Sequence, residues 1–234
     1  MTGGTGTLGK KIQELISCYA PAREELDITD IKSCENFFKK NKPDVIIHAA
    51  AYTDVSGAES NKKACWEVNV TGTENIIRAA DGKRFFFIST DYVFDGEKGN
   101  YAEDDIPNPT HFYALTKLAG ELIIRQYPRT LIIRTAFKPD GPWRYPTAFT
   151  DQFTSHEFVS IIAPDIISAV LMEDLEGVVH IAGERKSIYE LAKRVSPEVG
   201  AMSLGDVKTK LPRDTSLNCS KWKTILSQSS PAKK

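Results

Sequence analysis

Tyr113 and Lys117 are the residues whose types and spacing most directly suggest chemistry. They stand four positions apart in Tyr113-Ala-Leu-Thr-Lys117, which places them on one face of a helix. A tyrosine with its ordinary pKa of about 10 is a poor acid at neutral pH, and a nearby ammonium should lower that pKa. The pair could then exchange a proton with a carbonyl or alcohol oxygen. In a chain with eight tyrosines, one such pair could also arise by chance.

A hydroxyl at the end of an apolar segment strengthens this interpretation. Arg84-Phe-Phe-Phe-Ile-Ser89 is typical of a buried strand, and Thr90 follows it directly. Ligands bind at the carboxyl ends of strands in α/β sheets, so Thr90 could hydrogen-bond the oxygen that Tyr113 protonates. The alternative is that Thr90 caps a turn, a role that Asp91 also suits.

A glycine-rich loop opens the chain. Gly3, Gly6 and Gly9 are spaced by three residues, and an apolar helical face with Leu8 and Ile12 begins within the loop. Glycines let the backbone approach a pyrophosphate, and a helix N-terminus offers free N–H groups and a positive dipole end. Alone, the motif could equally be an ordinary glycine-rich turn.

The strand that normally precedes such a loop is missing, since Met1 and Thr2 alone stand before Gly3. Losing a central strand would leave backbone groups of its neighbours unpaired, at about 1–3 kcal/mol for each buried group. We therefore expect the upstream DNA to encode, in frame, about five apolar β-forming residues.

Arg23 stands where a dinucleotide fold reads the adenosine ribose, about 20 residues after the first glycine. No acid occupies positions 20–22, so Arg23 could pair with a 2′-phosphate and favour NADP over NAD. The alternative is a solvated surface arginine beside Glu24 and Glu25. Asp27 and Ile28 could border the adenine.

Apolar periodicity predicts helices alternating with buried strands. The expected helices are 8–16, 31–38, 58–80 in one or two pieces, 115–123, 164–173 and 188–195; the expected strands are 44–50, 84–89, 130–135 and 177–182. Thr29 or Asp30 could cap the second helix, and Ser187 with Glu190 forms a capping box. This alternation predicts an α/β fold with a doubly wound, Rossmann-like parallel sheet whose first strand is missing.

Residues 137–156 interrupt the alternation with prolines, glycines and aromatics. We expect residues 1–136 and about 158–183 to form a dinucleotide-binding domain, and about 137–157 and 184–234 to form a small substrate-side lobe. Trp143 or Tyr145 could stack on a base with Arg144 near a pyrophosphate. These aromatics could equally pack the lobe's own core.

The composition narrows the class of protein. Apolar residues make up 41%, enough for a sizeable core, and 30 basic residues nearly cancel 31 acidic ones, so neither nucleic acid nor a membrane is an expected partner. The four cysteines form no C-x-x-C pair, and we expect neither a disulfide frame nor a metal site. The longest apolar stretch, 161–172, is too short to cross a bilayer, and no signal peptide is evident. A soluble, cytoplasmic protein is expected.

Several further motifs occur in a characteristic order along nearly the whole chain. They are Thr-Gly-x-x-Gly-x-x-Gly, Leu-Asp-Ile-Thr-Asp (26–30), Ala-Ala-Ala-Tyr-Thr (49–53), Val-Asn-Val-x-Gly-Thr (68–73), Ser-Thr-Asp-Tyr-Val-Phe-Asp-Gly (89–96), Tyr-x-x-x-Lys, Ile-Arg-Thr (133–135) and Arg-Asp-Thr-Ser-Leu (213–217). In this the chain resembles the dTDP-4-dehydrorhamnose reductases, which are extended short-chain dehydrogenases/reductases. The segment 89–96 is the most discriminating; the glycine loop and the Tyr/Lys pair belong to the wider superfamily.

The resemblance implies a role for each matching residue. Thr90, Tyr113 and Lys117 would be the catalytic triad, Thr90 and Asp91 would contact the sugar, and Phe137 would take the place of a tryptophan that packs on substrate. Asn69 would hold the active-site helix, and His48 is expected to have no chemical role. The cofactor would be bound by the triad's Tyr113 and Lys117 together with Gly3, Gly6, Thr7, Leu8, Gly9, Arg23, Asp27, Ile28, Ala49, Ala50 and Ala51.

The implied function is an NADPH- or NADH-dependent reductase of a nucleotide-linked keto-sugar, as in dTDP-rhamnose biosynthesis, with a homodimer as one assembly. One alternative is an NAD-dependent nucleotide-sugar epimerase or dehydratase. Another is a non-catalytic nucleotide-binding subunit, because the family includes a regulatory subunit of methionine adenosyltransferase. The unusual stretch 138–146 leaves the sugar and the base open.

Overall fold

A four-stranded parallel sheet forms the centre of the molecule. The computed structural model describes residues 1–209 and 211–229. Its strands run in the order β1 (Val45–His48), β2 (Arg84–Thr90), β3 (Thr130–Thr135) and β8 (Gly177–His180). Strands β2 and β3 are in register from Phe85 opposite Thr130 to Thr90 opposite Thr135. The doubly wound parallel sheet predicted from the sequence is confirmed.

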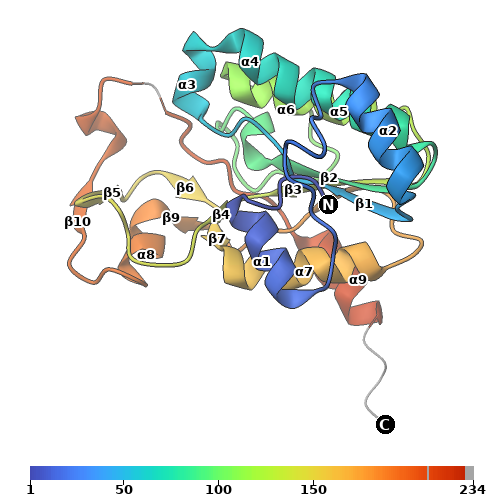
Figure 1. Cartoon of the computed structure of the whole chain (residues 1–234). Helices are drawn as coiled ribbons and strands as arrows, with labels where there is room; N and C mark the ends of the chain where they lie inside the picture. The colour runs from blue at the N-terminus through green and yellow to red at the C-terminus, as the bar shows by residue number, and fades with distance from the viewer. Residues whose placement is uncertain (210, 230–234) are drawn as a thin grey trace.

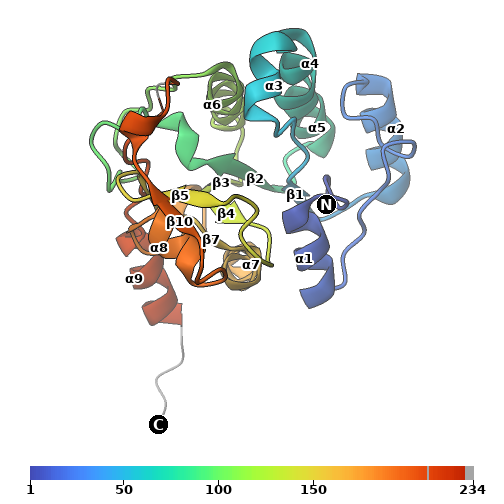
Figure 2. The ribbon, with the colours of Figure 1, turned by 90° about the vertical axis from the view of Figure 1, so that its left-hand side faces the viewer.

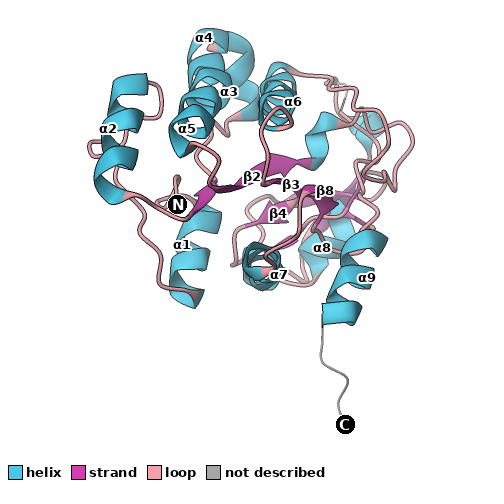
Figure 3. Ribbon diagram, turned by 90° about the vertical axis from the view of Figure 1, so that its right-hand side faces the viewer, coloured by secondary structure: helices cyan, strands magenta, loops and turns pink. Residues whose placement is uncertain are grey.

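Helices cover both faces of this sheet (Figures 1 and 3). One face carries α1 (Thr7–Leu15), α7 (Val159–Leu171) and α9 (Ser220–Ser229), and the other carries α2 (Ile31–Asn41), α5 (Gly72–Ala80) and α6 (Phe112–Ile124). Successive strand residues alternate between the two layers. Thus Phe86, Ile88 and Ile133 pack with α1 and α7, while Phe85, Phe87 and Ile132 pack with α2 and α5.

Two predicted helices depart most from the structure. The helix expected over 58–80 is broken into α3 (Val55–Ser60), α4 (Lys62–Trp66), a π-helical turn (Glu67–Thr71) and α5. The helix expected from Pro164 begins five residues earlier, at Val159, with the proline inside it. Buried side chains such as Ile162 and Ala163 in its first turns offset the cost of an internal proline.

The predicted helix caps are present. Asp30, rather than Thr29, caps α2 by accepting a hydrogen bond from the Lys32 N–H. Ser187 and Glu190 form the complete capping box that begins α8 (Ile188–Lys193).

The start of the described chain lies beside the edge of β1. The Thr2 N–H donates to the Ile47 carbonyl at 2.9 Å, and Thr2 forms a single parallel bridge with His48. The Met1 amino group donates to the carbonyl of Tyr19, and residues 18–20 form no strand. Ahead of the glycine loop, the described chain therefore adds one bridge to the sheet and no strand.

Short strands beyond β3 build a smaller lobe, seen in front in Figure 2. The pairs are β4 (Phe137–Lys138) with β7 (Glu157–Phe158), β5 (Thr147–Phe149) with β10 (Gly200–Met202), and β6 (Phe153–Thr154) with β9 (Lys186–Ser187). Ala148, Ala192 and Val199 form a small core under Trp143. Because β4 follows β3 almost directly, the lobe lies beside the carboxyl ends of the sheet strands.

Two further observations concern the described residues. The four cysteines are free thiols. No helix in residues 1–209 and 211–229 has both the length and the apolarity to span a membrane.

Candidate active site

A cavity of about 870 Å³ extends along the carboxyl ends of β1, β2 and β3. Every residue that the family resemblance assigned to cofactor binding, catalysis or sugar contact lies on its wall. These are Gly3, Gly6, Thr7, Leu8, Gly9, Arg23, Asp27, Ile28, Ala49, Ala50, Ala51, Thr90, Asp91, Tyr113, Lys117 and Phe137. The structure thus brings the selected residues together, while their individual roles remain predictions.

The glycine loop is packed too tightly for larger residues. Gly3 has a φ of +73°, and a Cβ there would lie 2.6 Å from the Ala49 backbone carbon. A Cβ on Gly9 would lie 2.2 Å from the Gly3 carbonyl oxygen. Helix α1 therefore begins directly against the end of β1.

The start of α1 suits an anion. No side chain caps the helix at Gly6, and no acidic residue stands in its first turn. The first N–H groups of a helix have no partner within it, and they carry the positive end of its dipole. On the cavity wall they could bind the pyrophosphate of a dinucleotide.

An orphaned hydroxyl is a second sign that this cavity binds a polar ligand, as a dinucleotide would be. Thr135 is 3% exposed, and its Oγ1 has no hydrogen-bond partner among the described residues. It lies on the cavity wall and is the register partner of Thr90 on the next strand. Buried hydroxyls are normally hydrogen-bonded, so a polar group in this part of the cavity would complete the site.

Tyr113 lies in the first turn of α6 and is buried among Ala58 and Cys65. Burial, followed by the nearby charge of Asp91, raises its pKa above the ordinary value. The predicted lowering of this pKa by Lys117 is therefore wrong, because desolvation dominates. Tyr113 is protonated at neutral pH, the form that can donate a proton.

Lys117 lies one helical turn further along α6 and is also buried. Its ammonium lies 4.0 Å from the centroid of the Phe87 ring. Burial lowers its pKa to about 7, against the opposing effect of Glu121. The burial that keeps Tyr113 protonated thus also weakens the charge on Lys117.

Thr90 and Asp91 are held in a small hydrogen-bond network. The Thr90 hydroxyl accepts from the Tyr92 N–H at 3.2 Å and donates to Asp91 at 3.1 Å, so its alternative role as a turn cap is confirmed. The second oxygen of Asp91 accepts from the Thr215 hydroxyl at 2.7 Å. Burial raises the pKa of Asp91 to about 6. Sequence reasoning missed Thr215, although it lies within the quoted motif 213–217.

Asn69 and His48 make the structural contacts expected of them. The Asn69 side chain accepts from the Tyr52 N–H at 2.7 Å and donates to the Thr116 hydroxyl at 2.9 Å, which joins the π-helical turn to α6. The two ring nitrogens of His48 are hydrogen-bonded with Thr2 and Thr73. π-Helical turns often occur at functional sites, and this one fixes the helix that carries Tyr113.

Arg23 lies at the outer end of the cavity. Its side chain is 76% exposed, and its guanidinium lies 3.6 Å from the Asp27 carboxylate. It lines the cavity, as a ribose-reading residue would, and it is also a surface arginine. Both interpretations stay open.

A second, mainly apolar cavity of about 330 Å³ lies in the lobe. Trp143 and Tyr145 line it, and Trp143 also packs on the lobe core, so both interpretations of these aromatics have support. Arg144 is exposed and lines the main cavity instead. Three residues that sequence reasoning missed lie on the walls of both cavities: Tyr92, Lys138 and His156.

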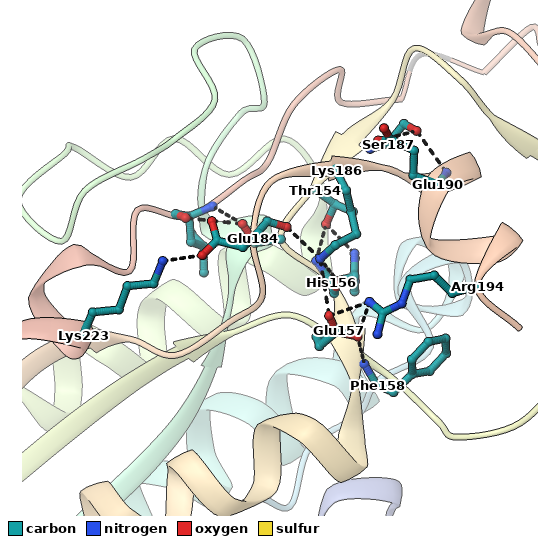
Figure 4. Close-up of polar contacts among 12 residues, drawn as sticks. Thr154, His156, Glu157, Phe158, Glu184, Lys186, Ser187, Glu190, Arg194 and Lys223 are labelled. Carbon is teal, nitrogen blue, oxygen red and sulfur yellow. Dashed lines mark hydrogen bonds and ion pairs between the residues drawn. The ribbon is translucent and has the colours of Figure 1, made fainter. Parts of the chain in front are cut away.

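Ion pairs hold the segment that carries His156 (Figure 4). The Glu157 carboxylate accepts two hydrogen bonds from Arg194, at 2.8 and 2.7 Å. Lys186 lies 3.5 Å from the same carboxylate and donates to the His156 carbonyl at 3.1 Å. These contacts, with the Thr154 hydroxyl against the His156 ring, fix His156 where the two cavities meet.

Several known proteins are similar to this chain in sequence. The family described as RmlD substrate binding domain matches residues 1–139. A dTDP-4-dehydrorhamnose reductase from Mycobacterium tuberculosis (strain CDC 1551 / Oshkosh) is 38% identical over 154 residues, which cover 60% of this chain and 50% of that protein. Methionine adenosyltransferase 2 subunit beta from Xenopus tropicalis is 36% identical over 135 residues, which cover 52% of this chain and 40% of that protein. The chain therefore spans about half the length, or less, of these relatives.

Solved structures match nearly the whole fold, and one of them holds NADP. The dTDP-4-dehydrorhamnose reductase from Bacillus anthracis, in complex with NADP, superposes with a TM-score of 0.86 at 25% identity. The match covers 96% of this chain and 91% of the other.

Proposed function

Since the chain belongs to the family of the RmlD substrate binding domain, we propose that it is an NAD(P)H-dependent reductase of a nucleotide-linked keto-sugar. The observation that carries the proposal is the meeting of Thr90, Tyr113 and Lys117 in the cavity that also receives the glycine loop. A proton donor, a polar side chain for orienting a carbonyl and an anion-binding helix start are the parts that such a reduction needs.

The chain's own residues have distinct tasks in this proposal. A bound NADPH or NADH supplies the hydride. Tyr113 donates its phenolic proton to the developing alkoxide, and Thr90 hydrogen-bonds the same oxygen and orients it. Lys117 binds the nicotinamide ribose, and the start of α1 holds the pyrophosphate. Asp91 and Phe137 border the sugar.

The experiment has two stages. NADPH and NADH are first titrated into the protein by fluorescence, and NADPH oxidation is then followed with dTDP-, UDP- and GDP-linked 4-keto-sugars. Turnover of at least one of these substrates supports the proposal, and the preferred nucleotide decides whether a place in dTDP-rhamnose biosynthesis follows. Conversion without net NADPH oxidation would instead support an epimerase or dehydratase with bound NAD.

The relatives named methionine adenosyltransferase 2 subunit beta support a second candidate, a nucleotide-binding subunit that performs no reduction. That protein would bind NADPH with no turnover on any sugar in the panel.

Cofactor choice gives a prediction for Arg23. If its guanidinium pairs with the 2′-phosphate, wild type should bind NADPH more tightly than NADH, and Arg23→Ala should lose that preference. Because the side chain is 76% exposed, solvent screens the contact, and we expect NADPH to bind about 2- to 5-fold more weakly in the variant. The effect should shrink as salt is added.

Arg78→Ala is the matched control, since Arg78 is another exposed arginine that pairs with an acid one helical turn away. It should leave the affinities for both cofactors unchanged. Equal NADPH and NADH affinities in wild type, or an unchanged preference in Arg23→Ala, would reject this role for Arg23.

A further inference from the structure

Lys138 occupies the junction between the two cavities. It ends β4 and lines both the cavity that holds Thr90 and Tyr113 and the apolar cavity of the lobe. A ligand that extends from the proposed reaction centre into the lobe must therefore pass Lys138. Tyr92 and His156 share this position.

The side chain of Lys138 is half-buried, and its ammonium has no hydrogen-bond or ion-pair partner in the described part of the chain. Within residues 1–209 and 211–229 it makes neither a hydrogen bond nor an ion pair. Asp91 is close enough to raise its pKa, yet burial dominates and lowers the pKa overall. Both Asp91 oxygens already accept hydrogen bonds from threonines. A desolvated cation without a partner is costly, and a bound anion would offset that cost.

The neighbours of Lys138 add hydrogen-bond donors. The Thr154 hydroxyl accepts from the His156 backbone N–H at 3.0 Å, and its own hydrogen can go to Nδ1, which leaves Nε2 of the ring as a donor. Burial keeps the His156 ring neutral by lowering its pKa. It also raises the pKa of Tyr92, so that phenol is a donor too. An ammonium, an N–H and an O–H together suit phosphate oxygens.

We propose that Lys138, with His156 and Tyr92, forms the subsite for the diphosphate of the nucleotide-linked substrate. The inference rests on the proposed function and deepens it. The three parts of such a molecule would meet suitable residues in turn. The sugar would lie at Thr90 and Tyr113, the diphosphate at the cation of the junction, and the base on aromatic side chains of the lobe, including Trp143, where it can stack. Arg144 is less suited to the task because it is exposed and its charge is screened by solvent.

Binding of nucleotides to Lys138→Met tests the proposal without any need for turnover. The probes are dTDP, UDP, thymidine and uridine, titrated by calorimetry into the full chain with saturating NADPH, so that no probe enters the cofactor cavity. Wild type should prefer a diphosphate over its nucleoside. Methionine keeps the length and removes the charge, so dTDP or UDP should bind about 10- to 100-fold more weakly, while nucleoside binding stays within about twofold.

Two further variants and one further probe sharpen the result. Lys138→Arg should keep most of the diphosphate preference, because a cation remains. Lys39→Met removes an exposed lysine of α2, away from both cavities, and should change nothing. Glucuronate tests whether the anion bound at Lys138 is a carboxylate. Its affinity should be the same in wild type and in Lys138→Met.

Four results would overturn the proposal: no diphosphate preference in wild type, an unchanged preference in Lys138→Met, equal losses for nucleoside and diphosphate, or a loss confined to glucuronate. Failure to reduce any sugar would reject the proposed function instead. That result leaves the nucleotide titrations fully interpretable, so the two failures are distinguishable.

Discussion

Replacing Tyr113 with phenylalanine should reduce the rate of carbonyl reduction by at least about 100-fold, the usual effect of removing a general acid. The change removes one hydroxyl and keeps the ring that packs against Ala58 and Cys65. Because the proton is transferred in the transition state, the loss should appear in kcat. The affinity for NADPH should stay within about twofold.

Tyr127→Phe is the control for this prediction. Tyr127 is half-buried beyond the end of α6 and packs on the core formed with α2 and α5, outside both cavities. Its variant should turn over at the wild-type rate. Single-turnover measurement of NADPH oxidation compares the two variants directly, and wild-type turnover in Tyr113→Phe would remove Tyr113 from the mechanism.

The elements that position Tyr113 and Thr90 could be predicted because their signals are local. Three consecutive phenylalanines give β2 a continuous apolar run. The strand ends at Thr90, which begins the turn at 91–93. The apolar positions of α6 likewise follow a helical period. The glycines, the strand ends and the Tyr/Lys pair, together with the family resemblance, selected residues that line one cavity.

The remaining features depend on contacts between distant parts of the chain. Thr215 hydrogen-bonds Asp91 across 124 positions, and Lys138 gains its position from a lobe whose short strands have no periodic signal. The pKa of Tyr113 could not be predicted for the same reason, because it depends on burial by residues distant in the sequence. Spacing shows that Lys117 lies on the same helical face, but it does not show how completely both groups are desolvated.

A buried ion pair beneath the site gives the prediction with the largest effect on stability. Arg134 on β3 and Glu121 on α6 are both fully buried. The guanidinium donates to the carboxylate through Nε and Nη2, at 3.0 and 2.8 Å. Ser89 on β2 donates to the same carboxylate at 2.6 Å. The pair thus links α6, which carries Tyr113 and Lys117, to the two strands that end at Thr90 and Thr135.

Arg134→Met should lower the free energy of unfolding by about 3–5 kcal/mol, because it leaves the Glu121 carboxylate buried without its counter-charge. That is a large part of the about 5–15 kcal/mol that holds a domain together. Urea unfolding followed by circular dichroism measures the change. Glu121 also raises the pKa of Lys117. A shift of this carboxylate would therefore change the pKa of a residue in the proposed active site.

Arg125→Met tests whether the stability loss comes from the burial of the ion pair or from the loss of any positive charge near Glu121. Arg125 lies 3.8 Å from the same Glu121 carboxylate, but its side chain is 47% exposed, so its loss should cost less than about 1 kcal/mol. A third variant replaces Arg134 with Met and Glu121 with Leu together. It should be more stable than Arg134→Met alone, because no unpaired charge remains buried. If Arg134→Met and Arg125→Met were equally destabilising, or if the double variant were the least stable of the three, the cost would lie in lost packing and not in the uncompensated carboxylate.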